Sequence, residues 1–190
     1  MSKFIIAIDP GLVGGIVFGH IDRVGVAVNA HAMPETETDV VDLLRSRIIN
    51  ARNNAADMSF EIVAVMEKVG GYVGGAGQPG SAMFSFGRGA GIIYGCLMYA
   101  KVRIEEVTPQ KWQKFLSLGH KEHAKATPMV NPAMAKLEAK RVAALNAKYK
   151  TEWKNKLKAE AQRLYPEIKV TLKTADALLI YEYAKRLKGF

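Results

Sequence analysis

Two short apolar runs in the first third of the chain each end in an acidic residue. Phe4–Asp9 reads FIIAID, and Glu61–Glu67 reads EIVAVME. Runs of this length and nearly continuous hydrophobicity predict strands that are buried on both faces of a sheet. Between them, Gly15–His20 and Gly25–His31 predict two more strands, so we expect the chain to open with a β-meander.

Apolar residues spaced by three and four predict the helices that follow. The predicted helices are Thr36–Arg52, Ser81–Lys101, Gln110–Leu116, Thr151–Leu164 and Thr174–Leu187, and the other predicted strands are Val102–Val107 and Ile168–Leu172. Gly87, Gly91 and Gly95 give the second of these helices a glycine-rich face, which should allow it to approach the sheet closely. Residues 117–150 are rich in Lys and Ala and contain two prolines, and they predict a basic helical insertion at about 119–152.

The length and composition favour one ordinary domain. The chain has 190 residues, and 49% of them are hydrophobic, so it can bury a substantial core. A mixed sheet covered by helices, an α/β domain that spans residues 1–190, is the expected architecture. No apolar run reaches the ~18–20 residues that a membrane-spanning helix needs. The single cysteine, Cys96, suits a reducing compartment, and we expect a cytoplasmic protein.

The charge of the chain is unevenly distributed. The first 108 residues sum to −2, whereas the remaining 82 sum to +11. A strongly basic half suits a polyanionic partner, and nucleic acid is favoured over a membrane surface.

Three carboxylates lie where apolar elements begin or end. Asp9 and Glu67 end the two predicted buried strands, and Asp176 lies near the start of the apolar helix after Thr174. Charges at the edge of a core are costly unless they are paired or bind a cation. Hard oxygen ligands of this kind suit Mg²⁺ or Mn²⁺.

These acidic residues and the motifs around them resemble the RuvC-type Holliday junction resolvases, and the phage-encoded branch most closely. Asp9 lies in AIDPG, Glu67 in VMEKV and Asp176 in TADALLI, and the chain has the three in that order. Further similar stretches are MFSFGR at 83–88, VTPQKW at 107–112 and AQRLYP at 161–166. The resemblance covers about residues 3–117 and 153–188.

The resemblance implies an RNase H-like fold, a five-stranded mixed sheet flanked by helices. It also implies a homodimer in which each subunit cuts one strand of a four-way DNA junction with two divalent cations, Mg²⁺ or Mn²⁺. Two such cations activate a water and stabilise the leaving oxygen. In this chain Asp9 would bridge both cations, Glu67 would bind one and Asp176 the other.

The chain departs from the family at Lys173. The family has a second acid three residues before the final Asp, and Lys173 stands there instead. Either another acid serves as the ligand, or Lys173 binds phosphate, or the site is weakened, or Lys173 is an engineered inactivating substitution. The family lysines near the scissile phosphate correspond to Lys111 or Lys114, and to Lys156 or Lys158. Tyr72 would correspond to an aromatic residue that stacks at the centre of the junction.

Two other functions remain open from the sequence. The protein could be a nuclease with a broader preference for branched DNA, such as forks and flaps. It could also be a junction-binding protein in which Lys173 marks weakened catalysis.

Overall fold

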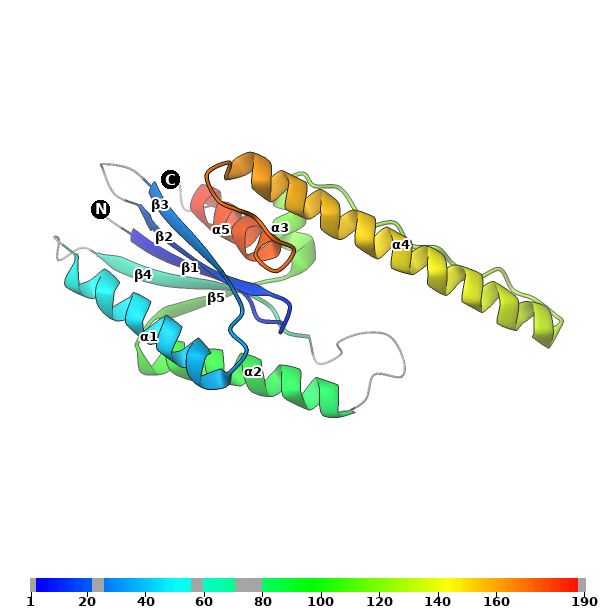
Figure 1. Ribbon diagram of the computed structural model, residues 1–190, viewed down its shortest axis with the longest axis horizontal. Helices are drawn as coiled ribbons and strands as arrows, with labels where there is room; N and C mark the ends of the chain where they lie inside the picture. The colour runs from blue at the N-terminus through cyan, green and yellow to red at the C-terminus, as the bar shows by residue number, and fades with distance from the viewer. Residues whose placement is uncertain (1–2, 22–25, 56–59, 71–79, 188–190) are drawn as a thin grey trace.

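A computed structural model describes residues 3–21, 26–55, 60–70 and 80–187 (Figure 1). In chain order the elements are β1 (Lys3–Asp9), β2 (Gly15–Ile21), β3 (Val26–Ala32), α1 (Glu37–Asn53), β4 (Glu61–Glu67), α2 (Gly80–Tyr99), β5 (Arg103–Val107), α3 (Pro109–Phe115), α4 (Pro132–Leu164) and α5 (Ala175–Leu187). Within the described residues, none of the helices is both long and apolar enough to cross a membrane.

The five strands form one mixed sheet in the order β3-β2-β1-β4-β5. β1 pairs with β2 in antiparallel fashion and with β4 in parallel fashion, and β5 runs parallel to β4. This topology confirms the predicted RNase H-like fold class, a five-stranded mixed sheet flanked by helices. The carboxyl ends of β1 and β4 meet at one edge of the sheet, because the two strands are parallel neighbours.

Alternating residues of β1 face two separate cores. Ile5 and Ala7 belong to the core that α3, α5 and the C-terminal part of α4 cover, whereas Ile6 and Ile8 belong to the core under α1 and α2. Both layers are visible in Figure 1, with α5 and α3 on one face of the sheet and α1 and α2 on the other. This arrangement explains why the sequence of β1 reads as a continuous apolar run.

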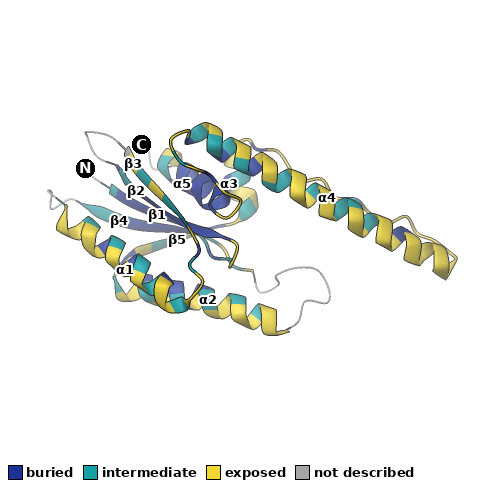
Figure 2. Cartoon of the chain, in the orientation of Figure 1, coloured by how far each residue is buried: buried dark blue, intermediate teal, exposed yellow. Residues whose placement is uncertain are grey.

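The region predicted as a basic insertion forms an arm. We define the arm as α4 residues 132–152 together with a backing segment, residues 119–131, that runs beside them (Figure 1). Most of the arm is exposed, as the yellow colour in Figure 2 shows, while Leu157 and Ala161 near the other end of α4 are buried in the core. The helix predicted at 151–164 therefore begins much earlier, at Pro132.

Two other sequence predictions are wrong. Residues 168–172 form no strand; instead Gln162 Nε2 donates a hydrogen bond to the Ile168 carbonyl at 2.9 Å, and its Oε1 accepts one from the Val170 amide at 3.1 Å. The glycine-rich face of α2 does not approach the sheet. A Cβ atom added at Gly87, Gly91 or Gly95 would meet nothing within 4 Å, so this face of the helix is open.

Candidate active site

Asp9 ends β1 at the centre of the sheet, and the turn that follows folds back over it. The Gly14 amide donates a hydrogen bond to the Gly11 carbonyl at 2.8 Å. A Cβ atom at Gly14 would lie 2.2 Å from the Asp9 carbonyl oxygen and 2.8 Å from its Cγ, so only glycine allows the turn to pack this closely. The close turn leaves the Asp9 side chain half-buried at the carboxyl edge of the sheet.

Glu67 ends β4, the parallel neighbour of β1. The register pairs Ile8 with Met66, so the next residues, Asp9 and Glu67, are neighbours at the carboxyl ends of the two strands. Trp112 of α3 is fully buried, and its Nε1 donates a hydrogen bond to Glu67 Oε2 at 2.9 Å. The sequence suggested only a packing role for Trp112, whereas the structure shows that it also orients this carboxylate.

Asp176 lies in the first turn of α5, which packs across β1 and β2. Only 7% of the residue is exposed. Its Oδ2 accepts a hydrogen bond from Lys154 Nζ, which also forms an ion pair with it. Its Oδ1 is buried and has no hydrogen-bond partner among the described residues. A buried carboxylate oxygen without a partner is costly and is suited to binding a cation.

These three side chains, which we call the carboxylate centre, act on one another electrostatically. Burial, and next the charge of Asp176, raise the pKa of Asp9 to about 6. Burial, and next the charge of Asp9, raise the pKa of Glu67 to about 7, although the Trp112 hydrogen bond opposes that shift. The charge of Lys154 lowers both values. Residues far apart in the sequence therefore form one cluster of acidic side chains, with the partly buried Lys154 beside it.

Lys154 is the functional candidate that the sequence reasoning missed. Burial opposes its positive charge, but the neighbouring Asp176, Asp9 and Glu67 outweigh that effect and raise its pKa. Lys156, which was predicted for this role, lies instead over the Trp153 ring, with its Nζ 5.5 Å from the ring centroid. The sequence did contain a signal for Lys154. An apolar residue such as Leu157, which is buried in the core, marks the side of the helix that faces the domain, and Lys154 lies about one turn before it on the same side.

The other predicted site residues are exposed or lie outside the described residues. Lys111 and Lys114 are exposed on α3, and Lys173 is exposed in the turn before α5. The lysine whose charge acts on Asp9 and Glu67 is Lys154. Tyr72 lies outside the described residues.

The carboxylate centre matches a hard divalent cation in its chemistry, but its present arrangement is not that of a metal site. Within the described ranges, no three His, Cys, Asp or Glu side chains are close enough together to hold a metal ion. Lys154 takes the position next to Asp176 and neutralises part of the negative charge. The donor oxygens and the unpartnered Asp176 Oδ1 fit Mg²⁺ or Mn²⁺, provided that the Lys154 ammonium moves away from Asp176.

Two solved structures of RuvC from Thermus thermophilus are similar to this chain. The first, described as the RuvC structure, is 14% identical, with a TM-score of 0.47 over 99% of this chain and 97% of that one. The second, RuvC in complex with a Holliday junction substrate, is 12% identical, with a TM-score of 0.47 over 98% of this chain and 96% of that one. No family model and no curated protein matches the chain. The case for a function therefore depends on the side chains of the site.

Proposed function

We propose that this protein is a divalent-metal-dependent endonuclease that resolves four-way DNA junctions by paired, symmetric nicks. The observation that carries the proposal is the carboxylate centre: Asp9, Glu67 and Asp176 come from three separate elements, and burial together with their proximity raises the pKa of Asp9 and of Glu67. The basic half of the chain supports a DNA substrate. The motifs around the three acids support a place among the RuvC-type resolvases, in the phage-encoded branch, and hence a site of action in the host cytoplasm.

The side chains of the site have distinct roles in this reaction. Asp9, Glu67 and Asp176 would hold Mg²⁺ or Mn²⁺, which supplies activation of a water and stabilisation of the leaving oxygen when bound. Trp112 fixes the position of one Glu67 oxygen through its Nε1 hydrogen bond. Lys154 neutralises part of the charge of the carboxylate centre, and its ammonium would bind the scissile phosphate in the DNA complex.

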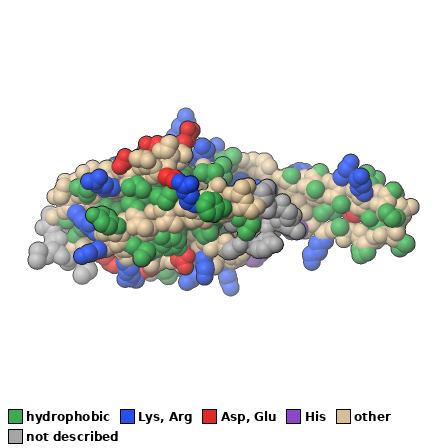
Figure 3. Space-filling model, turned by 90° about the horizontal axis from the view of Figure 1, so that it is seen from below, with side chains coloured by type: hydrophobic (Ala, Val, Ile, Leu, Met, Phe, Trp, Pro, Cys, Tyr) green, Lys and Arg blue, Asp and Glu red, His purple; other side chains and the backbone are tan. Residues whose placement is uncertain are grey.

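The open face of α2 supports a homodimer. Phe84, Gly87, Gly91, Gly95 and Met98 fall within about 80° of arc on the helix at 100° per residue. Phe84 is 69% exposed, and Met98 is 67% exposed. Beside this face lies a groove of about 850 Å³ between α1 and α2, on the side of the molecule where Figure 3 shows hydrophobic side chains in green. A second copy of α2 could pack on this face around a two-fold axis, which would match the symmetry of a four-way junction.

The dimer is tested by sedimentation of the wild type and of two variants. Phe84→Glu places a charge on the open face of α2, and we expect it to shift the protein to a monomer. Leu187→Glu is the matched control, because Leu187 is similarly exposed but lies at the end of α5. A wild type that stays monomeric with and without junction DNA would contradict the dimer.

One observation favours a second candidate function. Lys154 is paired with Asp176, and Lys173 adds a second cation close to the same helix start. If Lys154 does not leave Asp176, the protein would bind junctions without cutting them.

A cleavage assay distinguishes the candidates. Labelled four-way junction, fork, flap and duplex DNA are each incubated with the protein and Mg²⁺, or with EDTA. We expect paired nicks in the junction with Mg²⁺ only. Equal cutting of forks and flaps would instead indicate a broader branched-DNA nuclease, and a gel shift without cutting would indicate a binding protein.

A further inference from the structure

Hydrogen bonds hold the two parts of the arm, the helix and its backing segment, together. The Ala124 amide donates a hydrogen bond to Asn146 Oδ1 at 2.8 Å, and Asn146 Nδ2 donates one to the Ala124 carbonyl at 3.1 Å. Farther out, the Thr127 amide donates to Glu138 Oε1 at 3.2 Å, and Glu138, which is buried, pairs with Arg141 at 2.7 Å. These contacts hold the backing segment against one side of α4. The opposite side of the helix faces solvent.

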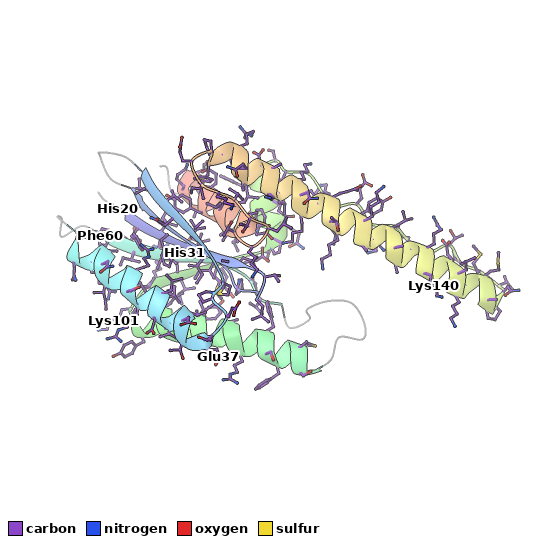
Figure 4. The ribbon with its side chains drawn as sticks, viewed as in Figure 1. His20, His31, Glu37, Phe60, Lys101 and Lys140 are labelled. Atoms are coloured by element: carbon purple, nitrogen blue, oxygen red, sulfur yellow. The ribbon has the colours of Figure 1, made fainter. Side chains whose placement is uncertain are left out.

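The lysines of α4 gather on that opposite side. Taking 100° per residue, five of its seven lysines fall within about 80° of arc. These five, which we call the lysine stripe, are Lys136, Lys140, Lys150, Lys154 and Lys158. In Figure 4, Lys140 is labelled on the edge of α4 away from the backing segment. The stripe therefore begins at the carboxylate centre, where Lys154 meets Asp176, and continues along the arm.

The acidic residues of α4 avoid this stripe. All three glutamates, Glu138, Glu152 and Glu160, lie about 160–240° around the helix from Lys136. The positions that complete the stripe between Lys140 and Lys150 are Ala143 and Ala147, which leave room for close approach of a large surface. A solvated helix has no need for such separation of charge, whereas a helix that lies against a polyanion does.

The length of the arm matches the dimensions of duplex DNA. From Lys154 to Pro132 the helix rises about 33 Å at 1.5 Å per residue. One turn of B-DNA is about 34–36 Å long. Because the strands of a duplex wind around its axis, a straight helix laid along it meets phosphates at intervals. The grouping of the stripe into Lys150, Lys154 and Lys158 near the site and Lys136 and Lys140 farther out suits such a contact.

The far end of the arm is apolar. Val130 is fully exposed, Leu137 is 63% exposed, and Met134 is 53% exposed. Figure 3 shows hydrophobic side chains at this end of the molecule, with lysine or arginine side chains projecting nearby. Leucine and methionine are among the apolar side chains that proteins insert between base steps from the minor groove.

We infer that the arm lies along the duplex that leads away from the cleavage site, for one helical turn. The lysine stripe binds phosphates of that duplex, and the apolar end contacts its groove about ten base pairs from the scissile phosphate. The inference rests on the proposed function, because it takes the carboxylate centre as the point where DNA is cut. The inference also predicts that each duplex arm of the DNA junction must reach a minimum length for full affinity.

The test measures affinity for four-way junctions whose arms are 6, 10, 14 or 20 base pairs long, by gel shift in EDTA. Lys136→Ala/Lys140→Ala removes the outer part of the stripe. Lys121→Ala/Lys125→Ala is the matched control, because it removes the same charge from exposed positions on the backing segment. We expect the stripe variant to lose about tenfold in affinity for arms of 14 and 20 base pairs, with a salt dependence lower by about two counterions, and almost nothing for 6-base-pair arms. The control should change little at any length.

Equal losses from the two variants, or a loss that does not depend on arm length, would overturn the inference. Wild-type cleavage of a short-armed junction with Mg²⁺ tests the proposed function separately. A second variant, Val130→Ser/Met134→Ser, tests the apolar end without changing charge, and circular dichroism checks that α4 is intact. We expect about a threefold loss with long arms alone. If this variant instead keeps its DNA affinity and loses self-association, the apolar end contacts protein and its assignment to DNA is wrong.

Discussion

The carboxylate centre and the arm are both charged regions, yet they hold their charges in opposite ways. In the centre, burial and mutual repulsion raise the pKa of Asp9 to about 6 and that of Glu67 to about 7. In the arm, Arg141 and the Thr127 amide hold the pKa of Glu138 near 2. The arm pairs its buried glutamate with Arg141, whereas the centre keeps like charges together and relies on Lys154 for partial compensation.

This difference supports the proposed division between a catalytic centre and an arm that contacts DNA. Carboxylates that are kept close despite their repulsion mark functional sites more often than structural ones. The exposed lysines of the arm cost nothing to maintain in water, so their arrangement on one side of α4 tells more than their number. Substitutions in the two regions should therefore change different quantities.

The largest effect is expected from Asp9→Asn, which should reduce cleavage of a four-way junction by about a thousandfold, because it removes a cation ligand. Junction affinity in EDTA should stay equal or rise, since one negative charge near the phosphate is lost. The metal-free protein should melt at an equal or higher temperature. Nicking by this variant at the wild-type rate would contradict the assignment of the carboxylate centre as the catalytic site.

Substitution of Lys154 and of Lys140 by methionine compares two lysines of the lysine stripe. The first substitution is Lys154→Met. It should lower the cleavage rate by about a hundredfold, since the scissile phosphate loses its contact with the Lys154 ammonium. It should also lower the melting temperature of the metal-free protein, because Asp176 then has no positive partner. Lys140→Met should change neither the cleavage rate at saturating junction DNA nor the melting temperature. Lys156→Met controls for a lysine of α4 that lies over the Trp153 ring. Identical behaviour of the 154 and 156 variants would show that Lys154 is ordinary helix surface.

The pH dependence of stability comes next. Because the folded-state pKa values of Asp9 and Glu67 are raised, the folded protein binds more protons than the unfolded chain between about pH 4 and 7. Their stabilising contribution is present below pH 4 and is lost as the pH rises through 6 to 7. Between pH 5 and 8, the unfolding free energy of the metal-free wild type should fall by about 4 kcal/mol relative to Asp9→Asn/Glu67→Gln. Urea titrations in EDTA at both pH values measure this difference, and parallel curves would contradict the shifts.

The smallest effect is expected from Lys173→Asp. Lys173 is exposed and lies outside the first turn of α5, so a new carboxylate there would act on the cations from the edge of the site. We expect the Mg²⁺ concentration for half-maximal cleavage to fall by about threefold. A higher dissociation constant for junction DNA, together with lost activity, would show instead that Lys173 binds the phosphate.

The strands and the three acids were predictable because a buried strand requires a nearly continuous run of apolar residues, which is easy to recognise in the sequence. The short apolar runs before Asp9 and Glu67 predicted buried strands, and parallel pairing brings the carboxyl ends of β1 and β4 together. The sequence also indicated that Asp176 starts an apolar helix. The acidic residues of the carboxylate centre and the ends of the elements that carry them could therefore be predicted from the sequence.

The start of α4 was missed because proline has two opposite effects in helices. Pro132 looked like an interruption, but it stands in the first turn of α4, where its missing amide costs nothing, and Asn131 accepts hydrogen bonds from the Ala133 and Met134 amides. The strand expected at 168–172 failed because the Gln162 side chain satisfies the polar backbone atoms there.

The sequence by itself determined the sheet, its two acidic strand ends and the basic character of the second half. Only the tertiary structure decided which cation serves the centre. Packing of Leu157 and Ala161 in the core sets the rotation of α4, and that rotation turns Lys154 toward Asp176 and Lys156 away. A local pattern can report whether a residue is buried, but the direction of a lysine on a long helix depends on contacts with residues far away in the chain.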